Sequence, residues 1–366
     1  MSITTNILTD RLPTEWGIQR IIADCTHCHA SLLIPESDLE TLCPICFQGN
    51  LNQSPSLFRS EPPERIIPSE IDTNRVNPLL DKFVNEVKMR CDDFSTQQLI
   101  NRMKLLYLPM WLVDATIKGQ WYASAGFPQH VKSSVEKFSN GSWKSQDVIE
   151  KKLRWEKRIG EISRRYDNIA VLASTNFKKI LTNANKNEYD LNQSAPYSPS
   201  LISNDRIAVP NIEPDVAWQN AQPSFEKLVY NDVVIACAAD QIQDYHLNPN
   251  FSNLNWTQVL LPVLTTYYLD DDGQYQVIMI NGQTGTIKGK RIASQRKGFL
   301  YAGIAFTIAL ATFLLGLGAF AIAPIIPPIS FLGLFFIPIA IIATIIAGYF
   351  MVLPWSWNKA QYQQDE

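Results

Sequence analysis

The hydrophobic pattern of the chain is dominated by residues 298–358, which contain no charged side chain. A transmembrane helix needs about 20 mainly apolar residues to cross a hydrocarbon core about 30 Å thick. The halves 298–323 and 331–355 are each long enough, and the prolines between them favour a turn. The pattern therefore predicts a transmembrane helical hairpin over 298–355, followed by a short tail at 356–366.

The region before this hairpin, 68–297, mixes helix-like and strand-like patterns. Apolar residues at three- and four-residue steps predict a helix over 78–89, and a second, short helix is expected over 96–103. Residues 106–122 and 260–277 each contain Leu-Pro, an apolar and β-branched run, Gly-Gln and an aromatic strand. This similarity predicts two related α+β halves with antiparallel β-hairpins, each turning at its Gly-Gln pair.

Three shorter segments add to this picture. Residues 169–172 are apolar and predict a buried strand, and 281–285 read Asn-Gly-Gln-Thr-Gly, which is typical of a turn. Residues 183–223 are rich in Asn, Ser and Pro. They predict an irregular surface segment with few elements of its own.

The N-terminal 50 residues contain two Cys-x-x-Cys motifs, at Cys25 and Cys28 and at Cys43 and Cys46. Two such pairs bring four sulfurs together in a tetrahedron, which is the geometry of structural zinc sites. With short apolar strands around them, the cysteines predict a zinc ribbon over 1–50 that holds one structural Zn²⁺. A proline-, serine- and asparagine-rich linker is expected over 51–67.

Two alternatives for this metal site stay open. His27 and His29 lie beside the first motif and are potential competing ligands, although four cysteines already complete a tetrahedron. The cysteines are also capable of forming disulfides, but tight pairs in a domain without a visible secretory signal favour reduced thiolates on a metal. The isolated Cys91 and Cys237 are expected to be buried apolar residues.

Composition and charge lower the prospects of nucleic-acid binding. The 366 residues carry a net charge of −3, and the ribbon contains more acidic than basic residues. The best basic and aromatic patch is 150–165, where acidic residues are interspersed, so a solvated surface is the simpler interpretation. Nucleic acid is therefore an unlikely partner on electrostatic grounds, because no positive field extends over the chain.

No catalytic motif is recognisable in the chain. His130 and His246 are the only histidines outside the first Cys-x-x-Cys motif and its flank, and neither lies in a known catalytic pattern. The uncharged segment has no ionisable side chain, which argues against a pump or proton-coupled transporter. A small channel of oligomerised hairpins stays open, but polar lining residues for it are lacking. We therefore expect a protein that is not an enzyme.

The charges that flank the uncharged segment predict its topology. A basic run precedes the first helix, whereas the turn near 324–330 is uncharged. By the positive-inside rule, the N-terminal region and both termini face the cytosol, and Trp355 and Trp357 fit an aromatic belt at the same interface. The flanking basic residues are Lys288, Lys290, Arg291, Arg296 and Lys297.

Small residues recur at three- and four-residue steps in both predicted membrane helices. Small side chains allow close approach of helix backbones in a bilayer, so these residues predict a packing face for the hairpin itself or for a partner helix. The residues singled out for packing are Ala305, Ala309, Gly316, Ala340 and Gly348.

The order of these parts resembles a family of bacterial zinc-ribbon membrane proteins. The resemblance rests on the paired Cys-x-x-Cys motifs, the Tyr-Leu-Pro-Met-Trp sequence at 107–111, the turn at 281–285, the basic run at 288–297 and the terminal hairpin. Such proteins are often labelled primosomal-protein-N′-like helicases or TFIIB-type zinc-ribbon proteins. The helicase label is not supported here, because the chain has no ATP-binding motif.

The resemblance implies a role beside phage-shock-type (PspA-like) and flotillin-like proteins in envelope stress or membrane organisation. We therefore expect a non-enzymatic, multi-pass adaptor in the bacterial inner (cytoplasmic) membrane, with its partners on the cytosolic face. The alternative is a membrane-tethered nucleic-acid-binding protein. A partner membrane protein is also expected, and a homo-oligomer is compatible with either function.

Overall fold

The computed structural model describes residues 16–54, 61–139, 142–175, 189–202, 205–322 and 324–363. Within them, eleven strands form one mixed sheet, with the main path in the order β11-β10-β9-β5-β8-β2-β1-β3. The strands are β1 Ile21–Cys25, β2 Ser31–Ile34, β3 Leu51–Gln53, β4 Arg65–Ile66, β5 Lys104–Ser139, β6 Ser142–Leu172, β7 Ala195–Pro196, β8 Arg206–Ala208, β9 Gln241–Leu269, β10 Tyr275–Asn281 and β11 Ile287–Gly289. The helices are α2 Thr73–Asn85, α3 Thr96–Asn101, α5 Pro214–Cys237, α6 Gln295–Ile322 and α7 Ser330–Gln363.

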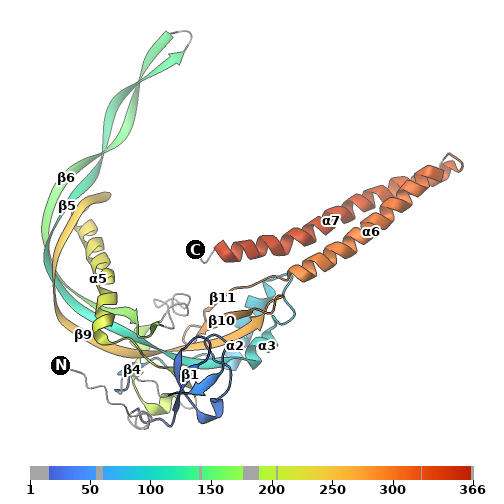
Figure 1. The fold of residues 1–366 in the computed structure, drawn as a ribbon. Helices are drawn as coiled ribbons and strands as arrows, with labels where there is room; N and C mark the ends of the chain where they lie inside the picture. Colours follow the sequence, from blue (N-terminus) through green and yellow to red (C-terminus); the bar gives the residue numbers. More distant parts are fainter. Residues whose placement is uncertain are drawn as a thin grey trace.

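Three parts of the molecule are distinguished below. The base contains the short strands, the near ends of β5 and β9, and helices α2 and α3. The arm is the long curved extension of β5, β6 and β9, and the helical hairpin consists of α6 and α7 (Figure 1). The α+β class expected from the sequence is confirmed, as are the cysteine cluster near the N-terminus and two apolar helices near the C-terminus.

The arm is built from unusually long antiparallel strands. β5 pairs with β6 from Met110↔Leu172 to Ser139↔Ser142. On its other edge, β5 pairs with β9 as far as Gly126↔Gln241. Beyond Gly126 the arm therefore has two strands, and β6 pairs only with β5 among the described residues.

The predicted pair of related hairpins differs from what the structure contains. In the second segment, Gly273 has a φ of 72° and turns the chain between β9 and β10, as expected. In the first, the expected turn at Gly119 is wrong, because this residue lies inside β5. A Cβ at Gly119 would lie 2.4 Å from the Asn248 carbonyl oxygen. Glycine is needed there for close approach of β9, not for a turn.

Helix α5 packs along the inner side of the curved arm (Figure 1). Its buried residues recur at every fourth position, which places them on one stripe of the helix facing the sheet. They are Ala217, Ala221, Phe225, Val229, Val233 and Cys237. The irregular segment predicted over 183–223 is thus wrong from Pro214 onward, where α5 begins; 183–188, 203 and 204 lie outside the described residues.

The two helices predicted in the base are present. The first begins earlier than predicted, at Thr73, because the Asp72 carboxylate accepts a hydrogen bond from the Arg75 amide and caps the helix. Pro78, the expected start, lies inside it. The second, α3, is capped by Ser95, whose side chain accepts from the Gln98 amide.

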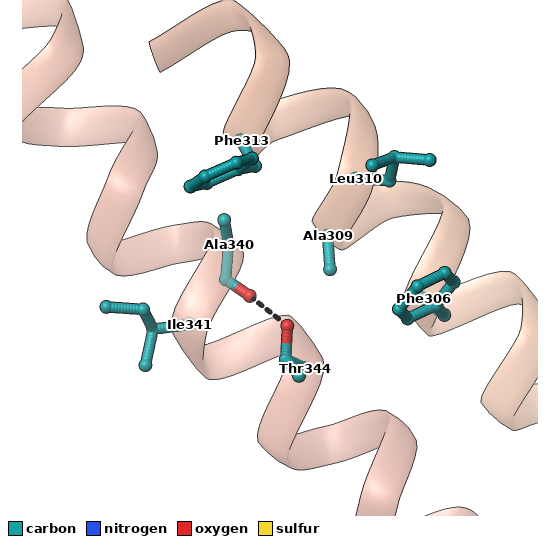
Figure 2. A pocket seen from close by; sticks show the side chains of 7 residues that line it. All are labelled: Phe306, Ala309, Leu310, Phe313, Ala340, Ile341 and Thr344. Carbon is teal, nitrogen blue, oxygen red and sulfur yellow. Dashed lines mark hydrogen bonds between the residues drawn. The ribbon is translucent and has the colours of Figure 1, made fainter. Parts of the chain in front are cut away.

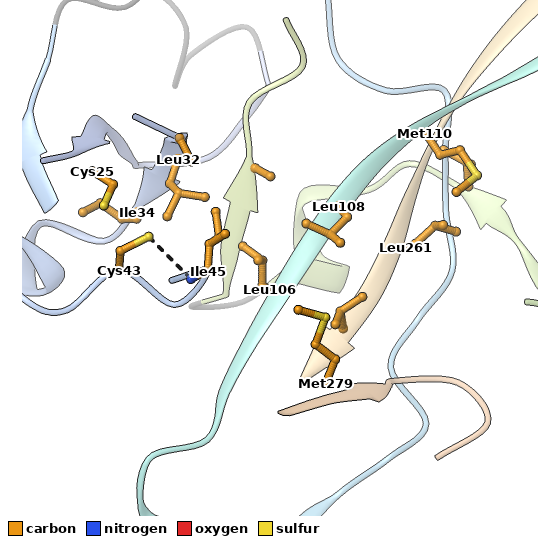
Figure 3. Packing of buried hydrophobic residues seen from close by; sticks show 14 of the residues in the cluster. Cys25, Leu32, Ile34, Cys43, Ile45, Leu106, Leu108, Met110, Leu261 and Met279 are labelled. Atoms are coloured by element: carbon orange, nitrogen blue, oxygen red, sulfur yellow. Dashed lines mark hydrogen bonds between the residues drawn. The ribbon is translucent and has the colours of Figure 1, made fainter. Parts of the chain in front are cut away.

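The cysteine-rich strands join the main sheet edge to edge. β2 pairs with β8, and β8 pairs in parallel with β5. Figure 3 shows the shared core, in which Ile45 and Leu32 lie beside Leu106 of β5. The range 51–67, predicted as a linker, contains β3 at one end and β4 with the fully buried Ile66 at the other, while 55–60 lie outside the described residues.

The helical hairpin is longer than the sequence pattern predicted. α6 begins at Gln295 and α7 continues to Gln363, so most of the predicted tail at 356–366 is helical. Residues 323 and 364–366 lie outside the described part of the chain. Both helices are long and apolar enough to cross a membrane. Only 22% and 11% of their most apolar windows are buried, which is far less than expected for core helices of a soluble domain.

Candidate metal centre and helical hairpin

The four predicted metal ligands come together at one point. The Sγ atoms of Cys25, Cys28, Cys43 and Cys46 all lie within 4.8 Å of one another. Cys25 and Cys46 are separated by 3.6 Å, and Cys28 and Cys43 by 3.8 Å, measured between sulfurs. A tetrahedral ion with bonds of about 2.3 Å requires sulfurs about 3.8 Å apart, whereas a disulfide requires about 2.0 Å. The arrangement can hold one metal ion.

Local backbone geometry orients these sulfurs. The amides of His27 and Cys28 donate to the Cys25 sulfur at 3.4 and 3.5 Å, and the Ile45 amide donates to the Cys43 sulfur at 3.4 Å. The last of these bonds is drawn in Figure 3. Amide donors stabilise negative charge on sulfur, as expected around thiolates bound to a cation. His27 and His29 are exposed and outside the four-sulfur cluster.

Close packing around the cluster leaves little freedom for substitution. A Cβ at Gly49 would lie 2.6 Å from the His27 amide nitrogen and 2.8 Å from the Cys25 sulfur. Hydrogen bonds to the Cys28 and Cys46 sulfurs, together with burial, raise the pKa of the Cys43 thiol above its usual range. Four thiolates this close repel one another, so their full deprotonation requires a neutralising cation.

The two isolated cysteines are both buried, as expected. Cys91 donates to the Ile292 carbonyl, and burial together with Asp271 raises the pKa of its thiol to about 12. Cys237 ends the buried stripe of α5, and burial raises its pKa as well. Neither thiol is activated as a nucleophile.

The basic run at 288–297, which ends in the first turn of α6, contacts the base. Lys297 forms an ion pair with Asp92 at 2.6 Å and donates to the Arg90 carbonyl at 2.9 Å. Arg291 forms an ion pair with Glu86, the residue that directly follows α2. Arg296 lies 4.0 Å from Asp272. Three of the five basic residues predicted to flank the membrane therefore also connect α6 to the base.

The end of α7 fastens the helical hairpin to the base from its other side. The buried Asn358 side chain accepts from the Ala293 amide at 2.8 Å and donates to the Ala293 carbonyl at 3.0 Å. The Trp357 indole donates to the Arg291 carbonyl at 2.6 Å. Sequence reasoning missed Asn358, although it is the first amide side chain after the apolar run. We call the contacts of Trp357 and Asn358 with Arg291 and Ala293 the hairpin anchor.

Helices α6 and α7 pack through small residues. Ala305, Ala309 and Gly316 are buried on α6, and Ala340 is buried on α7. Gly348 is exposed, and an added Cβ there would meet nothing. Four of the five predicted packing residues thus lie against the neighbouring helix, and Gly348 lies on an open side.

A groove of about 250 Å³ opens between these helices. Figure 2 shows Ala309 and Ala340 lying between larger apolar side chains such as Phe306 and Phe313. The only polar side chain that lines it, Thr344, already donates to the Ala340 carbonyl at 2.8 Å. Such a groove suits lipid or an apolar side chain rather than an ion path.

No protein-family model, curated protein or solved structure matches the chain. Function must therefore be inferred from the chemistry of the metal centre, the helical hairpin and the arm.

Proposed function

We propose that this protein is a non-enzymatic adaptor that is anchored in a membrane and presents a zinc-stabilised sheet to partner proteins. The observation that carries the proposal is an exposed apolar patch on the arm. Tyr122, Trp155 and Ile159 are 51%, 39% and 82% exposed. The strand register puts Tyr122 opposite Ile159 and Trp155 opposite Gly126, on the face away from α5. We call these three residues the outer patch.

Exposed apolar clusters of this kind mark protein interaction sites. The metal in the base is assigned as one structural Zn²⁺, because four cysteine sulfurs in a tetrahedron leave no open coordination position for catalysis. The contacts that join the helical hairpin to the base, such as the Lys297–Asp92 ion pair, fit a docking platform at a bilayer.

The helical hairpin is assigned as the membrane-spanning part. Its large apolar side chains point outward, where water would be unfavourable, while its small residues face the partner helix. The basic run at 288–297 favours the cytosolic face of the bacterial inner membrane for the base, by the positive-inside rule. Both termini are then cytosolic.

The proposed partners are phage-shock-type and flotillin-like proteins. We test this by affinity purification of the full chain from native membranes, comparing the natural protein with Ile159→Asp. Co-purification of such a partner that falls at least tenfold in Ile159→Asp supports the proposal. Lys118→Asp, an exposed change on the same face but nearer the base, is the matched control and should keep the partner.

Three results would contradict this proposal. If neither partner class is recovered with the natural protein, the adaptor role is contradicted. If recovery is equal with Ile159→Asp, the outer patch is not the docking site. Release of the chain from membranes by alkaline carbonate would contradict its assignment as a membrane-spanning protein.

Nucleic-acid binding is the weaker function, because the basic residues of β6 are largely paired. Arg154 and Arg158 both contact Glu156, at 2.7 and 2.8 Å, and Arg164 contacts Asp232 at 2.9 Å. Side chains that are already paired with carboxylates neutralise few phosphates, so few counterions leave the nucleic acid on binding. Affinity for RNA or DNA that falls by orders of magnitude between low and moderate salt would reverse this ranking.

A further inference from the structure

The end of the arm has two faces of opposite chemistry. The last cross-strand pairs include Phe138↔Trp143 and Lys137↔Lys144. Adjacent pairs on a strand point to opposite faces, so one face of the end carries two aromatic rings and the other carries two ammonium groups. We call these four residues the tip.

The aromatic face of the tip is open to solvent. Phe138 is 59% exposed and Trp143 is 68% exposed. Their ring centroids lie 5.3 Å apart in an edge-to-face arrangement. They contact each other, and in the part of the chain that the structure describes no third strand pairs with the sheet at this level. Two large aromatic side chains are thus held together and exposed.

The lysine face is electrostatically unfavourable as it stands. Lys137 and Lys144 lie directly opposite each other, and like charges in such a pair destabilise a hairpin. Neither forms an ion pair within the described part of the chain. An external anion between or beside the two ammonium groups would relieve this repulsion.

We propose that the tip binds the surface of an anionic lipid bilayer. Tryptophan is favoured at the depth of the headgroups, and phenylalanine is common on the apolar face of segments that lie in this interface. Lysine is attracted to anionic lipid at the same surface. The edges of the two-stranded arm leave backbone groups without strand partners, and these need water. The tip can therefore enter the interfacial region but not the hydrocarbon core.

A bilayer is favoured over other anionic partners because the molecule already carries a candidate membrane anchor, so the inference rests on the proposed membrane-spanning role of α6 and α7. In Figure 1 the arm and the helical hairpin both extend from the base toward the upper half of the view. A tethered tip meets lipid at high effective concentration, so weak contacts suffice.

The test uses the full chain reconstituted in vesicles of phosphatidylcholine, with or without phosphatidylglycerol. Dansylalanine replaces Ser142, an exposed residue beside Trp143, and lipids with a nitroxide on the acyl chain serve as quenchers. We expect blue-shifted, quenched emission in vesicles that contain phosphatidylglycerol. The double substitution Lys137→Gln and Lys144→Gln should lower the ratio of bound to free tip about thirtyfold.

Controls separate the tip from the rest of the arm. Phe138→Ala with Trp143→Ala should abolish quenching, whereas Lys118→Gln, an exposed charge change far from the tip, should leave it unchanged. Flotation of the vesicles reports the helical hairpin separately. A chain that floats while its dansyl group stays unquenched overturns the tip proposal alone, and a chain that does not float overturns the membrane anchor and the tip proposal with it. A spectral shift with single-stranded RNA but not with vesicles would assign the tip to nucleic acid instead.

Discussion

The arm and the helical hairpin are both long projections from one base, yet they expose apolar side chains in different ways. The helical hairpin has no charge from 298 to 358, and its backbone hydrogen bonds are made within each helix. The arm places charged residues along β6, and no described strand pairs with the outer edge of β6. A helix pair can enter hydrocarbon because no backbone group needs water, whereas an open strand edge cannot.

This difference assigns separate tasks to two superficially similar shapes. The helical hairpin suits insertion, and the arm suits contact with surfaces, through the outer patch and the tip. Charged side chains on an edge strand also oppose edge-to-edge aggregation of so long a strand. The two projections also join the base through different contacts, which we call their roots. The root of the arm is the core that it shares with the cysteine cluster, and the root of the helical hairpin is the hairpin anchor together with the ion pairs of Arg291 and Lys297. Variants at each root test the comparison.

Removing the metal should separate the two projections most strongly. Cys43→Ser should eliminate stoichiometric metal and the binding free energy of about 10 kcal/mol typical of structural zinc. Because Cys43 and Ile45 share a core with Leu106 and Leu108 of β5, we expect hydrogen exchange to rise in the base and the near end of the arm. The helical hairpin should stay protected.

Cys91→Ser is the matched control for this substitution. Cys91 is a buried thiol outside the four-sulfur cluster, so the variant should keep one metal per chain by native mass spectrometry. Full metal retention in Cys43→Ser would refute the four-cysteine site, and equal loss of protection in α6 and α7 would refute the separation of the two roots.

Asn358→Ala should loosen the root of the helical hairpin and leave the arm intact. The change leaves the Ala293 amide and carbonyl without their side-chain partner. At about 1–2 kcal/mol for each buried group left unpaired, the expected cost is about 2–4 kcal/mol. Hydrogen exchange over 287–294 should rise accordingly, measured in the same vesicles.

Gln361→Ala gives a graded control for the hairpin anchor. Its side chain only accepts one bond, from the Arg291 amide at 3.3 Å, so its effect should be smaller than that of Asn358→Ala. The reverse order of the two variants would mean that the hairpin anchor is held by other contacts.

Gly160→Ala should destabilise the arm through packing. The added Cβ would lie 2.5 Å from the indole of the buried Trp121, and overpacking of this kind costs about 1–3 kcal/mol. Gly318→Ala in α6 is the comparison, because a Cβ there meets nothing. We expect a lower thermal midpoint of the arm, followed by tryptophan circular dichroism, in the first variant only. Equal midpoints would show that Trp121 can move freely.

The sequence was most informative where function depends on local spacing. The two Cys-x-x-Cys motifs bring their own sulfurs together by local backbone geometry, and an uncharged run long enough to span a bilayer can be counted directly. Both features therefore depend little on contacts with the rest of the chain. The presence of helices α2 and α3 was likewise predictable from local apolar periodicity, although the start of α2 at the Asp72 cap was missed.

The remaining features depend on contacts between residues far apart in the sequence or were obscured by local composition, so they were not predicted. Gly119 resembles a turn residue until β9 is known to pass within contact distance of it. α5 begins in a segment rich in Asn and Pro, so its composition suggested a loop, although its apolar residues recur at every fourth position from Ala217 to Cys237. The ion pairs of Arg291 with Glu86 and of Lys297 with Asp92 join residues about 200 positions apart, which no local pattern predicts.

The smallest expected effect is a pH response at the root of the helical hairpin. Arg102 donates to both carboxylate oxygens of Asp93, one at 2.8 Å, and the Leu269 amide donates at 2.8 Å as well. The Arg102 guanidinium holds the pKa of Asp93 below its usual range. This stabilisation is fully present above the unfolded-state pKa of about 3.9 and is lost as the pH falls through the lower folded-state pKa.

Asp93→Asn should therefore lower the free energy of unfolding by about 1 kcal/mol at neutral pH, since solvent screens a pair that is about a quarter exposed. The difference from the natural protein should shrink toward zero in strong acid, measured by urea unfolding of the base at a series of pH values. The neighbouring Cys91 and Asp92 contact Ile292 and Lys297, so loss of the Asp93–Arg102 pair in acid should also weaken the root of the helical hairpin. A difference that stays constant with pH would mean that the Asp93 carboxylate contributes through shape alone.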